Sequence, residues 1–266
     1  MNLEHLLTLS IEASIAAGHE ILDVYGTEFS VDIKSDSSPL TQADRQAHNK
    51  IMEYLRDTDY PVLSEEGDVA DFSKRKDWHT FWLVDPLDGT KEFVKRNGEF
   101  TVNIALIENG TPIMGVIYVP VTDTLYAAAK GIGAYKGENG HAIHSVAALQ
   151  KRGSAIPHPP EEGAKFTVVG SRSHMSAETE TFMSELEKEH GEIDVLSRGS
   201  SLKLCMVAEG SAQVYPRFAP TMEWDTGAGQ AIAAISGCEV VRHDTGAPLT
   251  YNKENLLNPW FIVRRK

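Results

Sequence analysis

Two carboxylates three residues apart end the apolar stretch Trp82–Thr90. Asp85 and Asp88 follow an aliphatic run, and Gly89 and Thr90 come directly after them. We expect a short buried strand that ends in a tight turn and delivers both acids to the rim of a sheet. Carboxylate oxygens at such a rim could bind a hard cation. The ordinary alternative is a strand-ending turn, because Asp, Pro and Gly are favoured turn formers.

Further acids stand where another strand ends and where a helix begins. Residues 61–67 predict a short strand that runs into Glu65 and Glu66, and only one of these should face a shared site because adjacent strand side chains alternate. Asp225 is expected to cap a helix, whose N-terminus also offers N–H groups to phosphate. Gathered carboxylates must protonate or bind cations, and all-oxygen ligands favour magnesium, manganese or calcium. Magnesium fits an open acidic site best.

The first half of the chain predicts two packing helices and an antiparallel sheet. Apolar positions between residues 3 and 22 lie on one helical stripe, and a second helix follows Thr41 and Asp44, which have capping-box spacing. Asp36 lies in the polar loop before that helix, where an Asx turn is the ordinary interpretation. Three β-rich runs follow, with an Asn-Gly hairpin signal between the first two; they cover residues 100–107, 113–119 and 124–129.

The second half of the chain predicts alternating helices and strands. Residues 149–165 are rich in proline and charge and have no apolar period, so we expect a linker there. This divides the chain into a domain at 1–150 and a domain at 151–266. Composition and periodicity support a mixed α and β protein whose second half is α/β. Strands are expected at 166–169, 193–196, 212–215 and 238–241, and helices at 176–189, 201–208 and 226–235.

Composition and charge restrict the function classes. The 266 residues carry a formal net charge of −13, which disfavours nucleic acid as a partner and means that a cation should supply charge if a phosphate is handled. No apolar run approaches the ~20 residues of a membrane span. The N-terminus lacks the basic region of a signal peptide. Cys205 and Cys238 have no zinc-site spacing, so we expect a cytoplasmic protein without a disulfide framework.

Several motifs together resemble one family. In order and spacing, the chain is similar to the inositol monophosphatase superfamily of magnesium-dependent, lithium-sensitive phosphatases at residues 34–41, 64–66, 85–90 and 224–225. Within that superfamily it resembles the bacterial 3'(2'),5'-bisphosphate nucleotidases, which convert adenosine 3',5'-bisphosphate to AMP and inorganic phosphate and are linked to sulfate assimilation; this narrower likeness rests on residues 88–93, 170–174, 199–203 and 215–218. The resemblance spans nearly the whole chain and implies a layered αβαβα sandwich with the site at the junction.

The resemblance also implies a role for each matching residue. Two or three Mg²⁺ ions would be held by Glu65, Asp85, the Leu87 carbonyl, Asp88 and Asp225, and Li⁺ would inhibit. Asp36 and Thr90 would orient or deprotonate the attacking water, with Glu65 as the third catalytic residue. The resemblance implies that the substrate would also contact Glu65, Leu87, Asp88, Gly89, Thr90 and Asp225. The nucleotide and its second phosphate would be held by His174, Ser200, Lys203 and Arg217.

Two alternatives to this function stay open on the sequence. A lone Lys or Arg is ordinarily solvated surface charge, but Lys203 and Arg217 each interrupt an apolar segment, and an acidic protein needs local cations to hold a second phosphate. Without that role, the chain would be an inositol or sugar monophosphatase. From another class, it could be a catalytically silent metal- or nucleotide-binding protein. The expected partner is a small nucleotide bisphosphate; oligomeric state and weak peripheral association with the inner membrane are left open.

Overall fold

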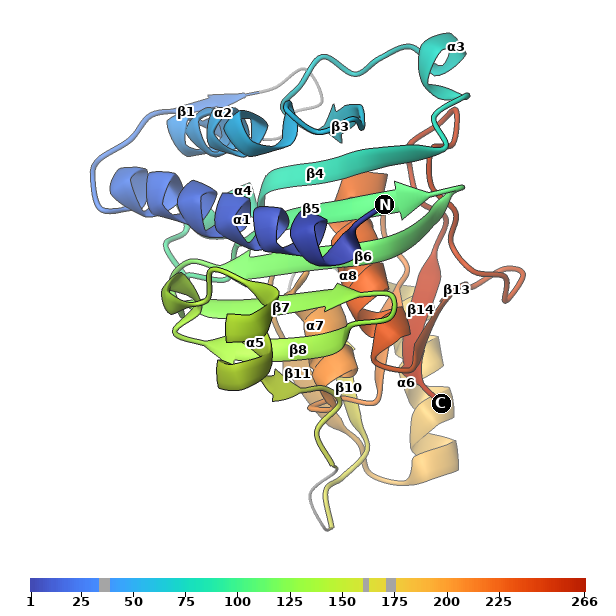
Figure 1. Ribbon diagram of the computed structural model, residues 1–266. Coiled ribbons are helices and arrows are strands. Elements are labelled where there is room, and N and C mark those ends of the chain that lie inside the picture. Colours follow the sequence, from blue (N-terminus) through green and yellow to red (C-terminus); the bar gives the residue numbers. More distant parts are fainter. Residues whose placement is uncertain (34–38, 160–162, 171–175) are drawn as a thin grey trace.

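The computed structural model describes residues 1–33, 39–159, 163–170 and 176–266, and these form five layers of alternating helices and sheets (Figure 1). Helices α1 (Leu3–Tyr25) and α2 (Gln42–Leu55) cover the outer face of a first sheet. Helices α7 (Leu202–Glu209) and α8 (Glu223–Ile235) lie between this sheet and a second one. The far face of the second sheet carries α6 (Ala177–His190). The predicted αβαβα sandwich is therefore confirmed.

The first sheet is mainly antiparallel, as predicted for this half. Within the described residues it has seven strands in sequence order, and only its first pair is parallel. Asn109 and Gly110 have φ values of 49° and 73°, the left-handed conformation that a tight two-residue hairpin needs, so the predicted hairpin is confirmed. The strands are β3 (Val62–Ser64), β4 (Thr80–Asp88), β5 (Thr101–Glu108), β6 (Thr111–Val119), β7 (Thr124–Ala129), β8 (Gly133–Glu138) and β9 (Ser154–Ala155).

The second sheet is mixed, and helices alternate with its strands. Its order among the described residues is β11-β10-β12-β14-β13, in which β10 is parallel to both neighbours and β14 is antiparallel to both of its own. The prediction of an α/β second half is confirmed, although no sequence pattern predicted the last strand. The strands are β10 (Thr167–Gly170), β11 (Asp194–Ser197), β12 (Val214–Arg217), β13 (Cys238–Arg242) and β14 (Phe261–Arg265).

Short elements connect the main layers. The ribbon β1 (Val31–Ile33) and β2 (Pro39–Thr41) leads into α2, which begins with the predicted capping box: Ala43 N donates to Thr41 Oγ1 (3.1 Å), and Thr41 N donates to Asp44 Oδ2 (2.7 Å). The other short elements are α3 (Phe72–Arg75), α4 (Thr90–Val94), η1 (Gly140–Ala142) and α5 (Val146–Arg152). The capping box starts α2 beside the turn that follows β4, where Asp44 contacts Thr90.

The expected linker at residues 149–165 is wrong over its first part. Residues 149–152 complete α5, and Ser154–Ala155 form β9, which pairs with β8. This edge strand is exposed on both faces, so it shows no apolar period in the sequence. One buried cluster combines side chains of the first sheet with those of α7, α8 and the second sheet. The two halves thus share a core, and the division at residue 150 stays a prediction.

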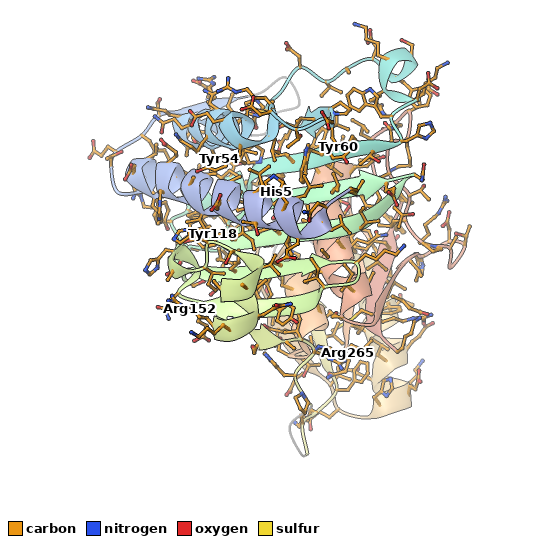
Figure 2. All side chains as sticks on the ribbon, viewed as in Figure 1. His5, Tyr54, Tyr60, Tyr118, Arg152 and Arg265 are labelled. Carbon is orange, nitrogen blue, oxygen red and sulfur yellow. The ribbon has the colours of Figure 1, made fainter. Side chains whose placement is uncertain are left out.

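Close packing of α8 on the first sheet sets the position of the helix. A Cβ atom added at Gly115 of β6 would lie 2.4 Å from the Ala228 carbonyl oxygen, so only glycine allows this approach. On the opposite face, side chains fill the space below α1 and α2, where Tyr54 and the buried Tyr118 are labelled in Figure 2. Within the part of the chain that the structure describes, no helix is long and apolar enough to cross a bilayer.

Candidate metal centre and active site

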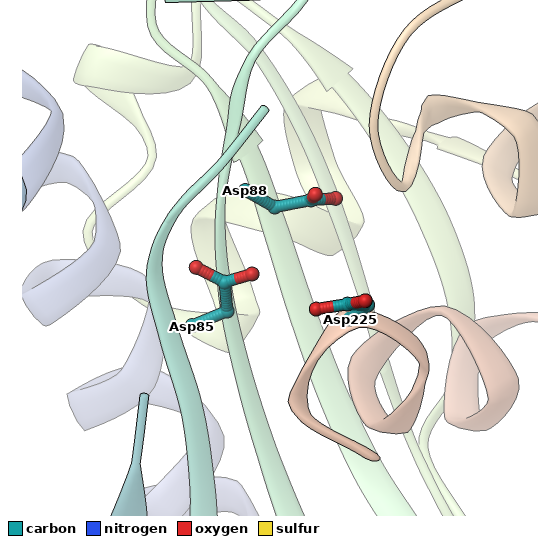
Figure 3. A group of neighbouring side chains, drawn as sticks. All are labelled: Asp85, Asp88 and Asp225. Atoms are coloured by element: carbon teal, nitrogen blue, oxygen red, sulfur yellow. The ribbon is translucent and has the colours of Figure 1, made fainter. Parts of the chain in front are cut away.

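Three carboxylates from distant parts of the chain converge at the junction of the two halves. Asp85 and Asp88 lie at the end of β4, and Asp225 lies in the first turn of α8. One oxygen of each lies within 4.8 Å of the others, and Figure 3 shows the three side chains facing one another. The predicted ligands Asp85, Asp88 and Asp225 are therefore brought together. Their metal-binding role is taken up below as a proposal.

The end of β4 is shaped by its own turn residues. The regular pairing of β4 with β5 is interrupted between Asp85 and Asp88. Leu87 N donates to Asp85 Oδ1 (3.1 Å), which closes an Asx turn. Gly89 has φ +93°, a left-handed conformation that favours glycine, and α4 begins at the next residue. The chain therefore bends sharply and turns Asp88 toward α8.

The acidic cluster, in which Asp85 is buried and Asp88 and Asp225 are half-buried, is electrostatically unfavourable without a cation. Asp85 is 1% exposed, and burial raises its pKa well above the ordinary value, with further contributions from the charges of Glu65, Asp88 and Asp225. Burial also raises the pKa of Asp225, and the charge of Asp88 adds to the effect. Such groups must protonate or gain a positive partner. An all-oxygen cluster of this kind fits a hard cation such as Mg²⁺.

Glu65 and Glu66 act on different groups, as predicted, although both lie in the turn after β3 and not on the strand itself. Glu65 hydrogen-bonds to the Asp85 carboxyl and raises its pKa. The charge of Glu66 raises the pKa of Asp44 in α2 instead. The structure therefore places Glu65 beside the three aspartates.

The acid that contacts Thr90 in the described residues is Asp44. Thr90 Oγ1 donates to Asp44 Oδ1 (3.1 Å), while Asp44 Oδ2 accepts from Thr41 N and Thr41 Oγ1 at 2.7 Å each. Burial raises the pKa of Asp44, although the hydrogen bonds from Thr41 and Thr90 oppose the rise. The sequence pattern predicts only a capping role for Asp44. Asp36, the predicted partner of Thr90, lies outside the described residues.

The sequence contains one sign that Asp44 could have a second role, but helix capping alone is enough to explain it. The third helical position of a capping box usually holds Glu or Gln, and here it holds Asp. The shorter side chain still satisfies the cap with one oxygen and leaves the other for a tertiary partner. Only the packing of α2 beside the turn after β4 identifies that partner as Thr90.

A cavity of about 670 Å³ opens beside the acidic cluster. Its lining includes Asp88 and Asp225 together with predicted substrate-binding residues from both halves: Gly89, Ser200, Lys203 and Arg217. His174, predicted to bind the nucleotide, lies outside the described residues. Two of the predicted metal ligands, Asp88 and Asp225, thus share one cavity with the predicted specificity residues Ser200, Lys203 and Arg217.

Lys203 is a buried charge, and Arg217 is half-buried. Lys203 is 6% exposed; its Nζ donates to the carbonyls of Ser200 (2.8 Å) and Arg198 (3.3 Å), and burial lowers its pKa to about 8. Arg217 Nη2 donates to the Pro220 carbonyl (2.9 Å), but Arg217 Nε is buried without a hydrogen-bond partner among the described residues, as is Ser200 Oγ. Such unsatisfied buried groups suit a polar or anionic ligand in the cavity.

Comparisons with known proteins cover nearly the whole chain. A family model described as the inositol monophosphatase family matches residues 2–260. The 3'(2'),5'-bisphosphate nucleotidases CysQ of Shigella flexneri and of Escherichia coli K12 are each 50% identical over 253 residues, which are 93% of this chain and 94% of each relative. The crystal structure of CysQ from Bacteroides thetaiotaomicron, a bacterial member of that family, superposes with a TM-score of 0.91 at 50% identity, covering 100% of this chain and 98% of the other.

Proposed function

The chain belongs to the inositol monophosphatase family, and on that premise we propose that it is a metal-dependent 3'(2'),5'-bisphosphate nucleotidase that acts in sulfate assimilation. It removes the 3'-phosphate of adenosine 3',5'-bisphosphate and releases AMP and inorganic phosphate; the sulfated relative of that nucleotide is a second candidate substrate. The observation that carries this proposal is the pair of cations Lys203, which is buried, and Arg217, which is half-buried, in the cavity that Asp88 and Asp225 also line. A monophosphate would need only the cluster.

The acidic cluster is proposed to hold magnesium. The donors are the carboxylates of Glu65, Asp85, Asp88 and Asp225 and the carbonyl of Leu87, and we propose two or three ions with Li⁺ as an inhibitor. When bound, Mg²⁺ lowers the pKa of water and stabilises charge on the attacking and leaving oxygens. The raised pKa values of Asp85 and Asp225 support the proposal, because a cation offsets the burial and the repulsion that raise them.

Thr90 and Asp44 are proposed to orient the attacking water. The Thr90 hydroxyl hydrogen points to Asp44 Oδ1, so the remaining lone pairs of Thr90 Oγ1 can accept a hydrogen bond from the water. This holds a lone pair of the water toward phosphorus, and Asp44 can take up a proton through the Thr90 hydroxyl. Burial suits Asp44 to this task because it raises the carboxyl pKa. Asp36 stays a prediction for the same role.

The second phosphate of the substrate is proposed to lie against Lys203, Arg217 and Ser200. Arg217 Nε and Ser200 Oγ are buried groups that a phosphate oxygen could satisfy. Lys203 supplies charge at the same cavity, and hydrogen bonds between charged groups are about twice as strong as neutral ones. Binding there would position the 3'-phosphate of the same nucleotide at the acidic cluster. His174 remains a predicted contact to the nucleotide.

A substrate panel tests the function. Phosphate release is measured from adenosine 3',5'-bisphosphate, AMP and inositol 1-phosphate, with Mg²⁺, without it, and with Mg²⁺ plus Li⁺. We expect the highest kcat/KM for the bisphosphate, dependence on Mg²⁺ and inhibition by Li⁺. Faster turnover of inositol 1-phosphate would favour the monophosphatase alternative. Nucleotide binding without any phosphate release would identify a catalytically silent protein.

Partners and location are proposed on the same basis. The substrate is a free small molecule, and the net charge of −13 supports this choice over nucleic acid. We propose that the protein works in the cytoplasm.

A further inference from the structure

A buried chain of hydrogen bonds runs from the first sheet through the second half of the protein to Asp88. It consists of Thr101 and Asn103 on β5 and Ser201 just before α7, which are 0%, 1% and 2% exposed. We infer that Asn103 and Ser201 are positioning residues for Asp88. Their hydrogen bonds occupy Asp88 Oδ2, and Asp88 Oδ1 stays available to bind the metal. The inference rests on the proposed function, since it assigns how one of the proposed ligands is oriented.

The direction of each hydrogen bond follows from the donors available. Thr101 Oγ1 donates to Asn103 Oδ1 (2.9 Å), so the amide nitrogen of Asn103 faces the other way. Asn103 Nδ2 donates to Ser201 Oγ (2.8 Å) and lies 3.5 Å from Asp88 Oδ2, which can only accept when ionised. The amide orientation is thus set from both sides. Ser201 Oγ, having accepted this bond, must direct its single hydrogen elsewhere.

The Ser201 hydroxyl has two acceptors within reach. These are Asp88 Oδ2 at 2.6 Å and the Asp225 backbone carbonyl at 2.8 Å. Donation to the carboxylate is favoured because a charge-assisted hydrogen bond is stronger than a neutral one. The backbone N–H of Ser201 also donates to Asp88 Oδ2 (2.6 Å). One oxygen of Asp88 therefore receives two short hydrogen bonds from a single residue, and Oδ1 is the oxygen that remains for a cation.

This arrangement opposes the repulsion within the acidic cluster. Without it, Asp88 could rotate away from Asp225, whose charge it faces. Ser201 is also one residue from Ser200, whose carbonyl accepts from Lys203 Nζ. The same turn therefore orients a proposed metal ligand and anchors a proposed phosphate ligand. Outer partners of metal ligands typically change metal affinity by about 10- to 100-fold when removed.

Metal binding to the full-length protein is the direct test. Mg²⁺ affinity is measured by titration calorimetry for wild type, Ser201→Ala and Ser10→Ala. Ser10 is the matched control, since it is a buried serine in α1 whose hydroxyl donates to the Leu6 carbonyl, and it belongs neither to the acidic cluster nor to the cavity lining. We expect about 10- to 100-fold weaker Mg²⁺ binding for Ser201→Ala and wild-type binding for Ser10→Ala. Circular dichroism without metal checks that each variant is folded.

Kinetics separate positioning from a general loss of structure. In Ser201→Ala, the Mg²⁺ concentration for half-maximal activity should rise by the same factor as the dissociation constant, while kcat at saturating Mg²⁺ stays within about threefold of wild type. Asn103→Ala should weaken Mg²⁺ binding in the same direction. The loss of Mg²⁺ affinity in the double variant should be smaller than the product of the fold losses in the two single variants, because both residues act through one chain of hydrogen bonds.

The possible failures can be told apart. If Ser201→Ala binds Mg²⁺ as tightly as an active wild type does, the inference is overturned and the proposed function stands. Fully multiplicative effects of the two single variants would also overturn the pairing of Asn103 with Ser201. If wild type binds no Mg²⁺ and releases no phosphate from the bisphosphate, the proposed function is overturned, and this inference with it.

Discussion

Thr90 donates its hydroxyl hydrogen to Asp44 across 3.1 Å, which ties the turn after β4 to the first turn of α2. The Leu87 carbonyl lies 3.3 Å from the same hydroxyl oxygen, but the charged acceptor at the shorter distance is favoured. A capping residue of one helix is thereby joined to the strand end that carries Asp85 and Asp88. The contact gives Asp44 a role in the proposed reaction that its local spacing does not reveal.

Replacing Asp44 with Asn should lower kcat by about 100-fold or more, the usual size of an acid–base contribution. The side-chain carbonyl of the introduced amide could still accept from Thr41, but its NH₂ group would face Thr90 and could not accept the hydroxyl hydrogen or a proton. The measurement is kcat at saturating Mg²⁺, with circular dichroism and Mg²⁺ affinity as checks on the fold and the metal site. Asp36→Asn is the comparison variant. A large loss in Asp36→Asn with normal kcat in Asp44→Asn would assign the water-orienting role to Asp36.

Replacing Asp88 with Asn should abolish turnover and leave the fold intact. The amide oxygen of the new side chain could still accept the hydrogen bonds from Ser201, but the charge that faces Asp85 and Asp225 would be lost. Loss of even an outer partner costs about 10- to 100-fold, so losing a ligand charge should lower kcat/KM by at least ~100-fold. Phosphate release, Mg²⁺ titration and circular dichroism measure the three effects. Wild-type turnover with Mg²⁺ would show that the proposed metal scheme is wrong.

Replacing Lys203 with Met should raise KM for the bisphosphate by about 10- to 100-fold, since hydrogen bonds to charged groups contribute about 1.5–3 kcal/mol. Met keeps the length of the buried side chain and removes its charge. Lys91→Met is the matched control, because Lys91 lines the same cavity but is exposed. An exposed charge contributes about 1 kcal/mol at most, so its effect on KM should stay below about fivefold. Equal KM increases in both variants would argue against a specific role of Lys203.

The lowered pKa of Lys203 predicts an alkaline limit for substrate capture. Burial lowers this pKa to about 8, so the side chain is charged below pH 8 and becomes neutral above it. Because kcat/KM reports the free enzyme, its value for the bisphosphate should fall as the pH rises above about 8. The arginine in Lys203→Arg stays charged throughout this pH range, so the fall of kcat/KM above about pH 8 should be absent in that variant. A wild-type profile that stays flat to pH 10 would contradict the prediction.

Magnesium should stabilise the folded protein. Asp85 is buried beside the half-buried Asp88 and Asp225, and a bound cation offsets their mutual repulsion. A ligand at about 100 times its Kd stabilises by about 2.7 kcal/mol, which corresponds to a Tm increase of roughly 5–10 °C for a chain of this length. Thermal unfolding is compared in chelator and in Mg²⁺, with NaCl added to equal ionic strength. Asp88→Asn should lose most of this Mg²⁺-dependent Tm increase. A Tm increase equal to that of wild type in this variant would contradict Mg²⁺ binding at the acidic cluster.

The sequence by itself determined the elements whose causes are local. An aliphatic run before turn-forming residues predicted β4 with Asp85 and Asp88 at its end, and Asn109-Gly110 predicted the hairpin, because these patterns act through hydrogen bonds and dihedral angles within a few residues. The same reasoning failed at Ser154–Ala155, where a short exposed strand depends on its neighbour β8 for its existence. The family resemblance added the layers and a role for each acid.

Only the tertiary structure decided which groups meet. Asp225 reaches Asp85 and Asp88 because close packing at Gly115 lets α8 rest on β6, and Thr90 meets Asp44 because α2 packs beside the turn after β4. No local pattern contains these contacts, since each joins segments that are far apart in the chain. Burial is likewise a tertiary property, and it changes Lys203 from an ordinary charged residue into a buried cation with a pKa of about 8. The residue types are written in the sequence, but their mutual distances and their burial arise only when the layers pack together.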